Sequence, residues 1–423
     1  MTTLLSDEPL SELMAVGQVD VLVGLPTLNH ADSVGPVVRA VHVAFNRELA
    51  RERTALVNVD GGSTDGTPDI VRDASLVDRE TLVASQSLRT RHRISAPYHG
   101  VPGKAAALRT IFAAADLLQA RAVVVLDPEI ASVTPESVVA LVRPALRGEA
   151  DFVSPVYVRH ALDGALVTQV VRPLFRAAYG LALQEPLAGE FGCSGLFAAR
   201  CLDEPAWETD DLRLAIDLWI SGTAAGDGLR VVEAALGPRR LTSRPRPAVA
   251  SLVPQVLDAL FTCLRLQEGA WTSPARGDAV RPAAAVLDPP APPPAADAAG
   301  YATLFRDGVS ALGEMLEPVL RPPTLEGLRA AAAPERAVEI PDALWAAAVM
   351  ELAAAHRHAT ISRDHLVRAA VPLYLGRVAS FAGEVSGLPP REAAERLEAL
   401  CVRFERCRGD LLALWTAPRG SHG

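Results

Sequence analysis

Acidic residues stand at two points where short apolar runs of the sequence end. Asp60 follows the run TALVNV and precedes two glycines, while Asp127 and Glu129 follow the run AVVVL. Two carboxylates one residue apart can hold a hard divalent cation, Mg²⁺ or Mn²⁺, which would bridge phosphates and neutralise a leaving group. A carboxylate followed by glycines can approach a flat base closely and accept its N–H. Both segments are also consistent with ordinary polar turns.

Three further segments carry polar groups that suit a phosphate or a sugar. Lys104 follows a Pro-Gly turn at the expected start of a helix, where an ammonium group and the helix N-terminus together favour a diphosphate. The loop QEPLAGEFG contains small residues such as Gly189, which let backbone amides approach a ligand, and Glu190 could orient a sugar hydroxyl. Asp217 adjoins the apolar face of an amphipathic helix over 210–220 and could reach a cleft. A solvated lysine, a helix-capping glutamate and an exposed aspartate are the plainer alternatives.

Several strands must lie side by side to bring these groups together. Apolar runs rich in β-branched residues predict strands at 19–25, 54–59, 122–126 and 152–158. Helical spacing occurs at 34–50 and 103–118, and the Thr-Pro pairs at Thr67 and Thr134 begin two more helices. This alternation predicts an α/β fold with a mostly parallel sheet, in which ligands bind beyond the carboxyl ends of the strands.

The chain has 423 residues, which is more than one ordinary hydrophobic core needs. We expect an N-terminal segment (1–17), a sheet domain (18–250), a helix with a Pro/Ala-rich linker (251–299) and a helical C-terminal region (300–423). The alanine-rich faces of that last region would allow close helix packing, either on the sheet domain or in a homodimer.

Composition excludes several classes of partner and location. The net charge is −9 and no basic stripe is present, which argues against nucleic acid as the main partner. The five cysteines are odd in number and form no CxxC, which favours reduced thiols in a cytoplasm. No signal peptide and no apolar run of about 18 residues is evident, so no membrane span is expected.

Five segments together indicate a protein family more specifically than any one of them does. They are PTLNH, VDGGSTDGT, GVPGKAAAL, VVVLDPEI and EPLAGEF. In this order and spacing they resemble the GT-A glycosyltransferases related to family 2. The similarity is greatest to the retaining branch, which contains glucosyl-3-phosphoglycerate synthase and mannosylglycerate synthase. It implies a GT-A (Rossmann-like) sheet and transfer of a hexose from a nucleotide diphosphate sugar to a small, glycerate- or phosphoglycerate-like acceptor.

The resemblance also implies a role for each matching residue. The nucleoside pocket would be lined by Pro26, Leu28, His30, Asp60, Gly61 and Gly62. Lys104 would contact the diphosphate, Asp127 the ribose or metal, and Glu129 the metal. The donor sugar would be flanked by Gly189 and Glu190, with Asp217 on its hydroxyls. Thr168 falls where the phosphoglycerate enzymes bind the acceptor.

The sequence departs from the family pattern at three places. The family's LNE ends in His30 here, which would alter the ribose contacts. The usual metal-ligand histidine after the last core strand is absent, and Arg239 or Arg240 could instead neutralise the diphosphate as a permanent cation. Leu166 replaces the arginine two residues before Thr168, so a phosphate acceptor lacks that bidentate partner, unless Arg159 or Arg172 supplies it.

Other functions fit parts of this pattern. An inverting family-2 transferase would use Asp210 or Asp211 as the base that deprotonates the acceptor. A nucleotide-sugar-binding protein that has lost catalysis would explain the missing histidine and the altered acceptor position. A sugar nucleotidyltransferase ranks lower, because 25–33 contains no glycine-rich phosphate loop.

Overall fold

The computed structural model describes residues 13–75, 81–85, 103–208, 212–226, 229–241, 248–273, 297–334 and 336–417. Its described residues form two compact units. The sheet unit comprises those within Met1–Val158 and Leu183–Arg246, and the helical unit those within Arg159–Ala182, Pro247–Arg276 and Asp288–Gly423. The sheet domain predicted as the continuous range 18–250 is therefore interrupted, because Arg159–Ala182 packs with the C-terminal helices.

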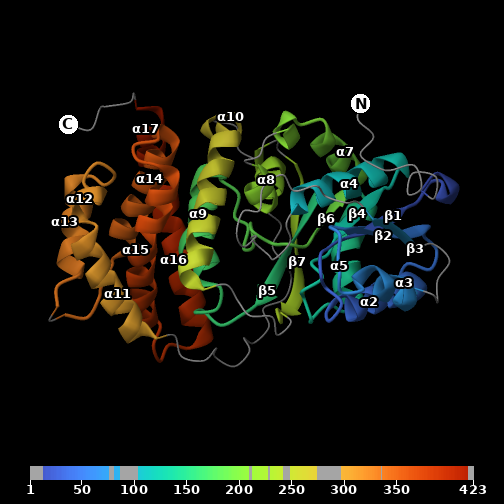
Figure 1. Ribbon diagram of the computed structural model, residues 1–423, viewed down its shortest axis with the longest axis horizontal. Helices are drawn as coiled ribbons and strands as arrows, with labels where there is room; N and C mark the ends of the chain where they lie inside the picture. The colour runs from blue at the N-terminus through green and yellow to red at the C-terminus, as the bar shows by residue number, and fades with distance from the viewer. Residues whose placement is uncertain are drawn as a thin grey trace. The chain divides into compact units, whose positions relative to one another are not determined.

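The sheet unit is built on seven strands (Figure 1). These are β1 (Val21–Thr27), β2 (Thr54–Asp60), β3 (Thr81–Ser85), β4 (Ala122–Val125), β5 (Phe152–Val158), β6 (Phe191–Ser194) and β7 (Val231–Pro238). Their order is β3-β2-β1-β4-β6-β5-β7, and only β6 runs antiparallel to its neighbours. The predicted α/β class with a mostly parallel sheet and a helical C-terminal extension is confirmed.

Helices cover both faces of this sheet (Figure 1). They are α2 (Val34–Arg47), α3 (Thr67–Ser75), α4 (Lys104–Leu117), α5 (Pro135–Leu146), α7 (Gly195–Leu202) and α8 (Leu212–Gly226), with a short 3₁₀ turn at Pro205–Glu208. Valines of α2 and α5 pack on one face against fully buried strand residues such as Val23 and Val124. The predicted cap of α5 is present, since the Thr134 hydroxyl accepts the Ser137 N–H at 3.2 Å.

The helical unit begins with a rare π-helix, η2 (Val167–Val171), which runs directly into α6 (Arg172–Tyr179). Its other helices are α9 (Val249–Leu266), α10 (Glu268–Thr272), α11 (Ala298–Ala311), α12 (Gly313–Leu316), α13 (Pro322–Ala331), α14 (Asp342–His358), α15 (Arg363–Glu384), α16 (Pro390–Arg406) and α17 (Arg408–Thr416). Close packing of α11 on α15 depends on Gly376, where a Cβ would lie 2.4 Å from the Phe305 ring. Most of the predicted Pro/Ala-rich linker lies outside the described residues.

Within the described residues, α9 is the one helix long and apolar enough to cross a membrane by length and composition. Over half of its 18-residue window, 56%, is buried against the rest of the protein. Its Asp258 lies 2.9 Å from Nε2 of His356 on α14. Burial of one face and a polar contact to a neighbouring helix are features of a core helix.

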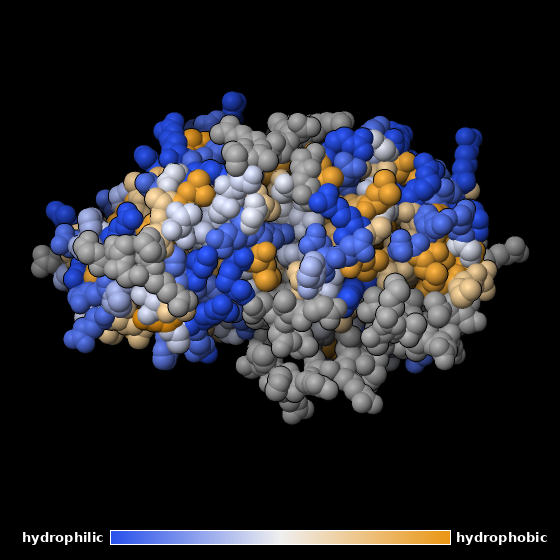
Figure 2. Space-filling model, turned by 90° about the horizontal axis from the view of Figure 1, so that it is seen from above, coloured by the Kyte–Doolittle hydropathy of each residue, from blue (hydrophilic) through white to orange (hydrophobic). Residues whose placement is uncertain are grey.

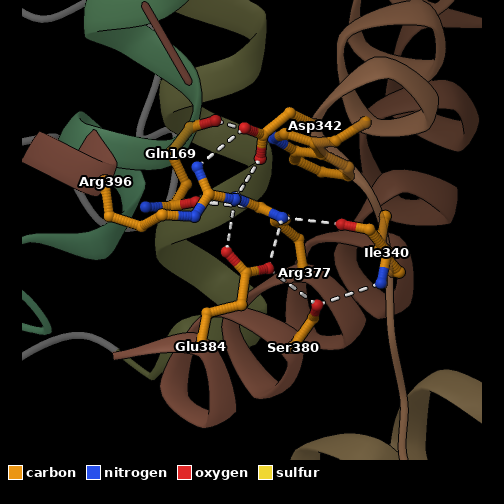
Figure 3. A network of polar contacts seen from close by, with 8 residues as sticks. Gln169, Ile340, Asp342, Arg377, Ser380, Glu384 and Arg396 are labelled. Atoms are coloured by element: carbon orange, nitrogen blue, oxygen red, sulfur yellow. Dashed lines mark hydrogen bonds and ion pairs between the residues drawn. The ribbon is translucent and has the colours of Figure 1, made fainter. Parts of the chain in front are cut away.

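A fully buried arginine, Arg377 of α15, joins several segments of the helical unit (Figure 3). Its guanidinium contacts Asp342 at 2.9 Å, Glu384 at 3.0 Å and the Ile340 carbonyl at 2.6 Å. Arg396 of α16 contacts the same two carboxylates at 2.8 and 2.6 Å. Two cations thus balance two anions, which is the condition under which charges are tolerated in a protein interior.

The same arginine also reaches the π-helix. Its Nε donates to Oε1 of Gln169 at 2.9 Å, and the indole N–H of Trp345 donates to the Gln169 carbonyl at 2.7 Å. A π turn widens the helix and frees backbone groups from their regular partners. We infer that Trp345 and Arg377 stabilise the π turn by satisfying polar groups of Gln169.

Hydrophilic and hydrophobic residues are interspersed on the face shown in Figure 2. The most exposed large apolar side chains among the described residues are Leu196 (85%) and Met14 (68%). Single exposed apolar residues are normal on soluble domains.

Candidate active site

The predicted meeting of strand ends is present in the sheet unit. β1 pairs in parallel with β2 and with β4, and Thr27 lies opposite Asp60 in the register. The loops that follow these strands therefore leave the sheet at one edge. Pro26 is buried within β1 opposite Val59, and a Cβ on Gly61 would lie 3.4 Å from the Leu28 side chain.

Side-chain acceptors bind the loop after β1 to the loop after β2. The backbone N–H of His30 donates to Oγ1 of Thr67 at 2.7 Å, and that of Ala31 donates to Asp65 at 2.9 Å. Thr67 in turn donates to Asp65 at 2.5 Å. We call the two loops, 28–31 and 61–67, the clasp. The predicted nucleoside-pocket residues Leu28, His30, Gly61 and Gly62 all belong to it.

The sheet unit also contains a buried ion cluster, which is formed by Lys104, Asp127, Glu190, Asp217 and Arg239. Lys104 begins α4, and its Nζ lies 2.7 and 2.9 Å from the two carboxylate oxygens of Asp217 on α8. The side chains are only 6% and 1% exposed. Burial raises the pKa of Asp217 above its ordinary value, and the ammonium of Lys104 opposes that rise. Lys104, the predicted diphosphate contact, thus forms an ion pair with Asp217, the predicted sugar contact.

The absence of a side chain at Gly189 leaves room for two members of the cluster, Asp127 and Lys104. A Cβ there would lie 2.9 Å from Oδ2 of Asp127 and 3.3 Å from Nζ of Lys104. Any side chain at this position would push the acid and the ammonium apart. The sequence predicted that a ligand could approach this loop closely. In the structure, the groups that lie against Gly189 are the Asp127 and Lys104 side chains.

Glu190 lies at the other end of the cluster and is 1% exposed. The Tyr157 hydroxyl, on β5, donates to its Oε1, and Nη2 of Arg239 lies 3.9 Å from its Oε2. Burial is the main cause that raises the pKa of Glu190 to about 7, and the negative charge of Asp127 adds to it. Arg239 and Tyr157 act in the opposite direction. Tyr157 was not among the predicted site residues, although it is the second-last residue of a predicted strand.

This pKa predicts a pH dependence of stability. Because Glu190 binds its proton more tightly in the folded chain than at its ordinary pKa, its stabilising contribution is complete at low pH and is lost as pH rises through about 7. We expect the melting temperature to fall more steeply between about pH 5 and pH 8 in the wild type than in Glu190→Gln. Thermal unfolding across that range measures both slopes. Equal slopes would show that Glu190 does not titrate there, and the exposed Glu317→Gln serves as control.

The structure distinguishes the two arginines after β7. Arg239 is 16% exposed in its side chain and lies 5.4 Å over the Tyr157 ring. Its Nε and Nη2 have no hydrogen-bond partner among the described residues, and together they form the fork that matches two oxygens of an anion. Burial lowers the pKa of Arg239, but Glu190 and Glu185 outweigh it, so the pKa lies above the ordinary value. Arg240 is exposed; its backbone N–H donates to the Ser132 hydroxyl, and its carbonyl accepts the Ala131 N–H.

The two acids of the predicted metal pair, Asp127 and Glu129, contact other groups of the sheet unit. Asp127 Oδ1 accepts the backbone N–H of Glu129 at 2.9 Å, and Oε1 of Glu129 lies 3.5 Å from Nε2 of buried His30. Because Nδ1 of His30 accepts the Leu28 N–H at 2.9 Å, the neutral ring carries its proton on Nε2 and cannot ligate a metal there. No group of three or more metal-binding side chains occurs in the described part of the chain.

The acceptor residue predicted by resemblance, Thr168, lies in the helical unit. It is 7% exposed in the π-helix, and its hydroxyl lies 3.5 Å from the Ala165 carbonyl. Arg172 pairs with Glu398 at 3.1 Å within the same unit, so it is engaged there. Asp210 and Asp211, the candidate bases of an inverting enzyme, lie outside the described residues.

No protein-family model and no curated protein matches the chain. Solved structures do match over 60% of it. One, described as a mycobacterial protein, is 26% identical, with 77% of that chain covered and a TM-score of 0.45. Glucosyl-3-phosphoglycerate synthase from Mycobacterium tuberculosis with phosphoglyceric acid is 24% identical, with 83% covered and a TM-score of 0.43. The same enzyme with Mn²⁺, uridine diphosphate and glucosyl-3-phosphoglycerate is 22% identical, with 83% covered and a TM-score of 0.43.

The chain is similar to glucosyl-3-phosphoglycerate synthase.

Proposed function

We propose that the chain is a glycosyltransferase that moves a hexose from a nucleotide diphosphate sugar to a small hydroxy acid, with retention at the anomeric carbon. The buried ion cluster is the observation that carries this proposal. It brings two cations and three carboxylates together in the sheet unit, which also contains the glycine-containing loops of the clasp. A nucleotide sugar needs these groups together, with loops for the nucleoside, cations for the diphosphate and carboxylates for sugar hydroxyls.

The cluster stabilises charge that develops when the sugar leaves the diphosphate. Arg239 and Lys104 would donate hydrogen bonds to phosphate oxygens, and burial makes each interaction stronger than in water. Phosphate oxygens would compete with Asp217 for Lys104. Asp217 and Glu190 would then accept hydrogen bonds from sugar hydroxyls. A divalent cation beside Asp127 would add positive charge at the same phosphates.

Retention is proposed because the sequence motifs resemble the retaining branch of the family. The acceptor hydroxyl would attack from the face that the diphosphate leaves. The test is donor turnover with glycerate and with 3-phosphoglycerate, followed by NMR of the product. An α-linked product from an α-linked donor supports retention, and a β-linked product favours Asp210 or Asp211 as an inverting base. Nucleotide binding without turnover of any acceptor would favour a binding protein that has lost catalysis.

Gly189→Ala should impair this site without unfolding the chain. The added Cβ would lie 2.9 Å from Asp127, so the acid or the loop must shift. Displacement of about 1 Å in a reacting site lowers rates by roughly 100-fold, and we expect a loss of at least 10-fold in turnover. Gly383→Ala is the control, because a Cβ there meets nothing within 4 Å. Equal turnover by the two variants would show that turnover does not depend on the close contact of Asp127 and Lys104 with Gly189.

A further inference from the structure

The Asp60 carboxylate is held by hydrogen bonds within its own surroundings. Its Oδ2 accepts the backbone N–H groups of Gly62 and Ser63 at 3.0 and 2.7 Å. Its Oδ1 accepts the Ser63 hydroxyl at 2.5 Å and lies 2.9 Å from the Thr27 hydroxyl. The Thr27 hydroxyl also lies 2.9 Å from Oδ1 of Asn58, but it has a single proton to donate. A carboxylate oxygen is the stronger acceptor, so we assign that proton to Asp60. A carboxylate accepts about four hydrogen bonds, so these partners use its capacity.

Ser63 links the Asp60 carboxylate to the loop after β1 by hydrogen bonds. While it donates to Asp60, its oxygen accepts the backbone N–H of Asn29 at 2.7 Å. The Asn29 side chain in turn accepts the Thr64 N–H at 2.9 Å. Asn29 has a φ of 55°, a left-handed conformation that asparagine tolerates but that still needs support from its neighbours. The chain of contacts from Asp60 through Ser63 to Asn29 supplies that support.

We propose that Asp60 is a positioning residue that holds the clasp together through Ser63 and Asn29, and that the clasp recognises the base of the nucleotide. The base N–H is then not accepted by the Asp60 carboxylate. Asp60 is 3% exposed, and a base could reach it only by displacing a partner already bound. This inference rests on the proposed function, since it concerns how the same site selects its nucleotide.

A double-mutant cycle separates positioning from direct contact with the base. Asp60→Asn, Ser63→Ala and the double variant are titrated by calorimetry with UDP, GDP and ADP. The measured quantity is the ratio of affinities for the best-bound and worst-bound nucleotides. Ser63→Ala leaves the carboxylate in place but breaks the link to Asn29. We expect each single variant to lower the ratio about tenfold, and the double variant to lower it no further.

The exposed Asp69→Asn, on α3, is the matched control and should keep the wild-type ratio. Inorganic pyrophosphate should bind all four proteins equally, because it has no base. A ratio lost in Asp60→Asn but retained in Ser63→Ala would overturn the proposal, as would a wild type that binds all three nucleotides equally. Wild type that binds none of them would instead remove the proposed function. If Asp60→Asn does not fold, as judged by its melting temperature, Ser63→Ala alone decides.

Discussion

Arg239→Gln is expected to lower glycosyl transfer by about 100-fold, while Arg240→Gln stays within about threefold of the wild type. The two arginines are neighbours in sequence, but Arg240 is exposed, whereas Arg239 is half-buried and lies beside Glu190 and over the Tyr157 ring. Its Nε and Nη2 form a rigid fork that a phosphate can occupy, and glutamine has neither the charge nor the fork. Loss of one preorganised donor in a buried site lowers rates by about two orders of magnitude.

Arg239→Lys and a chelator complete this experiment. Lysine keeps the charge but not the fork, so we expect an intermediate rate. The melting temperature of each variant should be measured, so that a loss of rate is not mistaken for unfolding. Equal loss in the Arg239 and Arg240 variants would contradict the structural distinction. Complete loss of wild-type turnover with chelator, together with normal turnover in Arg239→Gln, would assign the cationic role to a metal.

Arg377→Met is expected to destabilise the helical unit by about 3 kcal/mol. Methionine fills a similar volume but leaves Asp342 and Glu384 with Arg396 as their only cation among the contacts of this network. Removing one partner from a buried ion pair costs about 3–5 kcal/mol, and the lower end applies because the carboxylates are partly exposed. Burial lowers the pKa of Arg377 from its ordinary value, although the two carboxylates oppose that shift.

Calorimetric melting measures this effect, which corresponds to a shift of about 6–12 °C for a unit of this size. Arg368→Met is the matched control on the same helix. Its pair with Asp364 is 66% and 65% exposed, so its loss should change stability by less than about 1 kcal/mol. Equal melting temperatures for the two variants would show that the network is not a major source of stability.

The sequence was sufficient to predict four of the seven strands, β1, β2, β4 and β5, and the edge at which their polar groups gather. Asp60 and Asp127 follow apolar runs, and parallel strands place such ends together. The positions of Lys104 and of the Thr134 cap also followed from local rules for helix starts. These features depend on residues within one strand, turn or helix, which is why the pattern of residue types was enough.

The partners of the charged groups could not be predicted in the same way. Lys104 and Asp217 are 113 residues apart, and nothing local indicates that they neutralise each other. Burial of Arg239 but not Arg240 depends on how β7 ends beside Tyr157. The π-helix at 167–171 was not predicted, and the two side chains that donate hydrogen bonds to its Gln169, Trp345 and Arg377, lie far along the chain.

The most direct test of the nucleotide-sugar site is calorimetric titration of the wild type with UDP, GDP and ADP, each with and without Mg²⁺. We predict saturable binding of one nucleotide, and a loss of at least tenfold in its affinity in Arg239→Gln. Binding that persists without Mg²⁺ would show that Arg239 and Lys104 suffice for the diphosphate. Failure of all three nucleotides to bind, in both conditions, would contradict the account and leave only the fold.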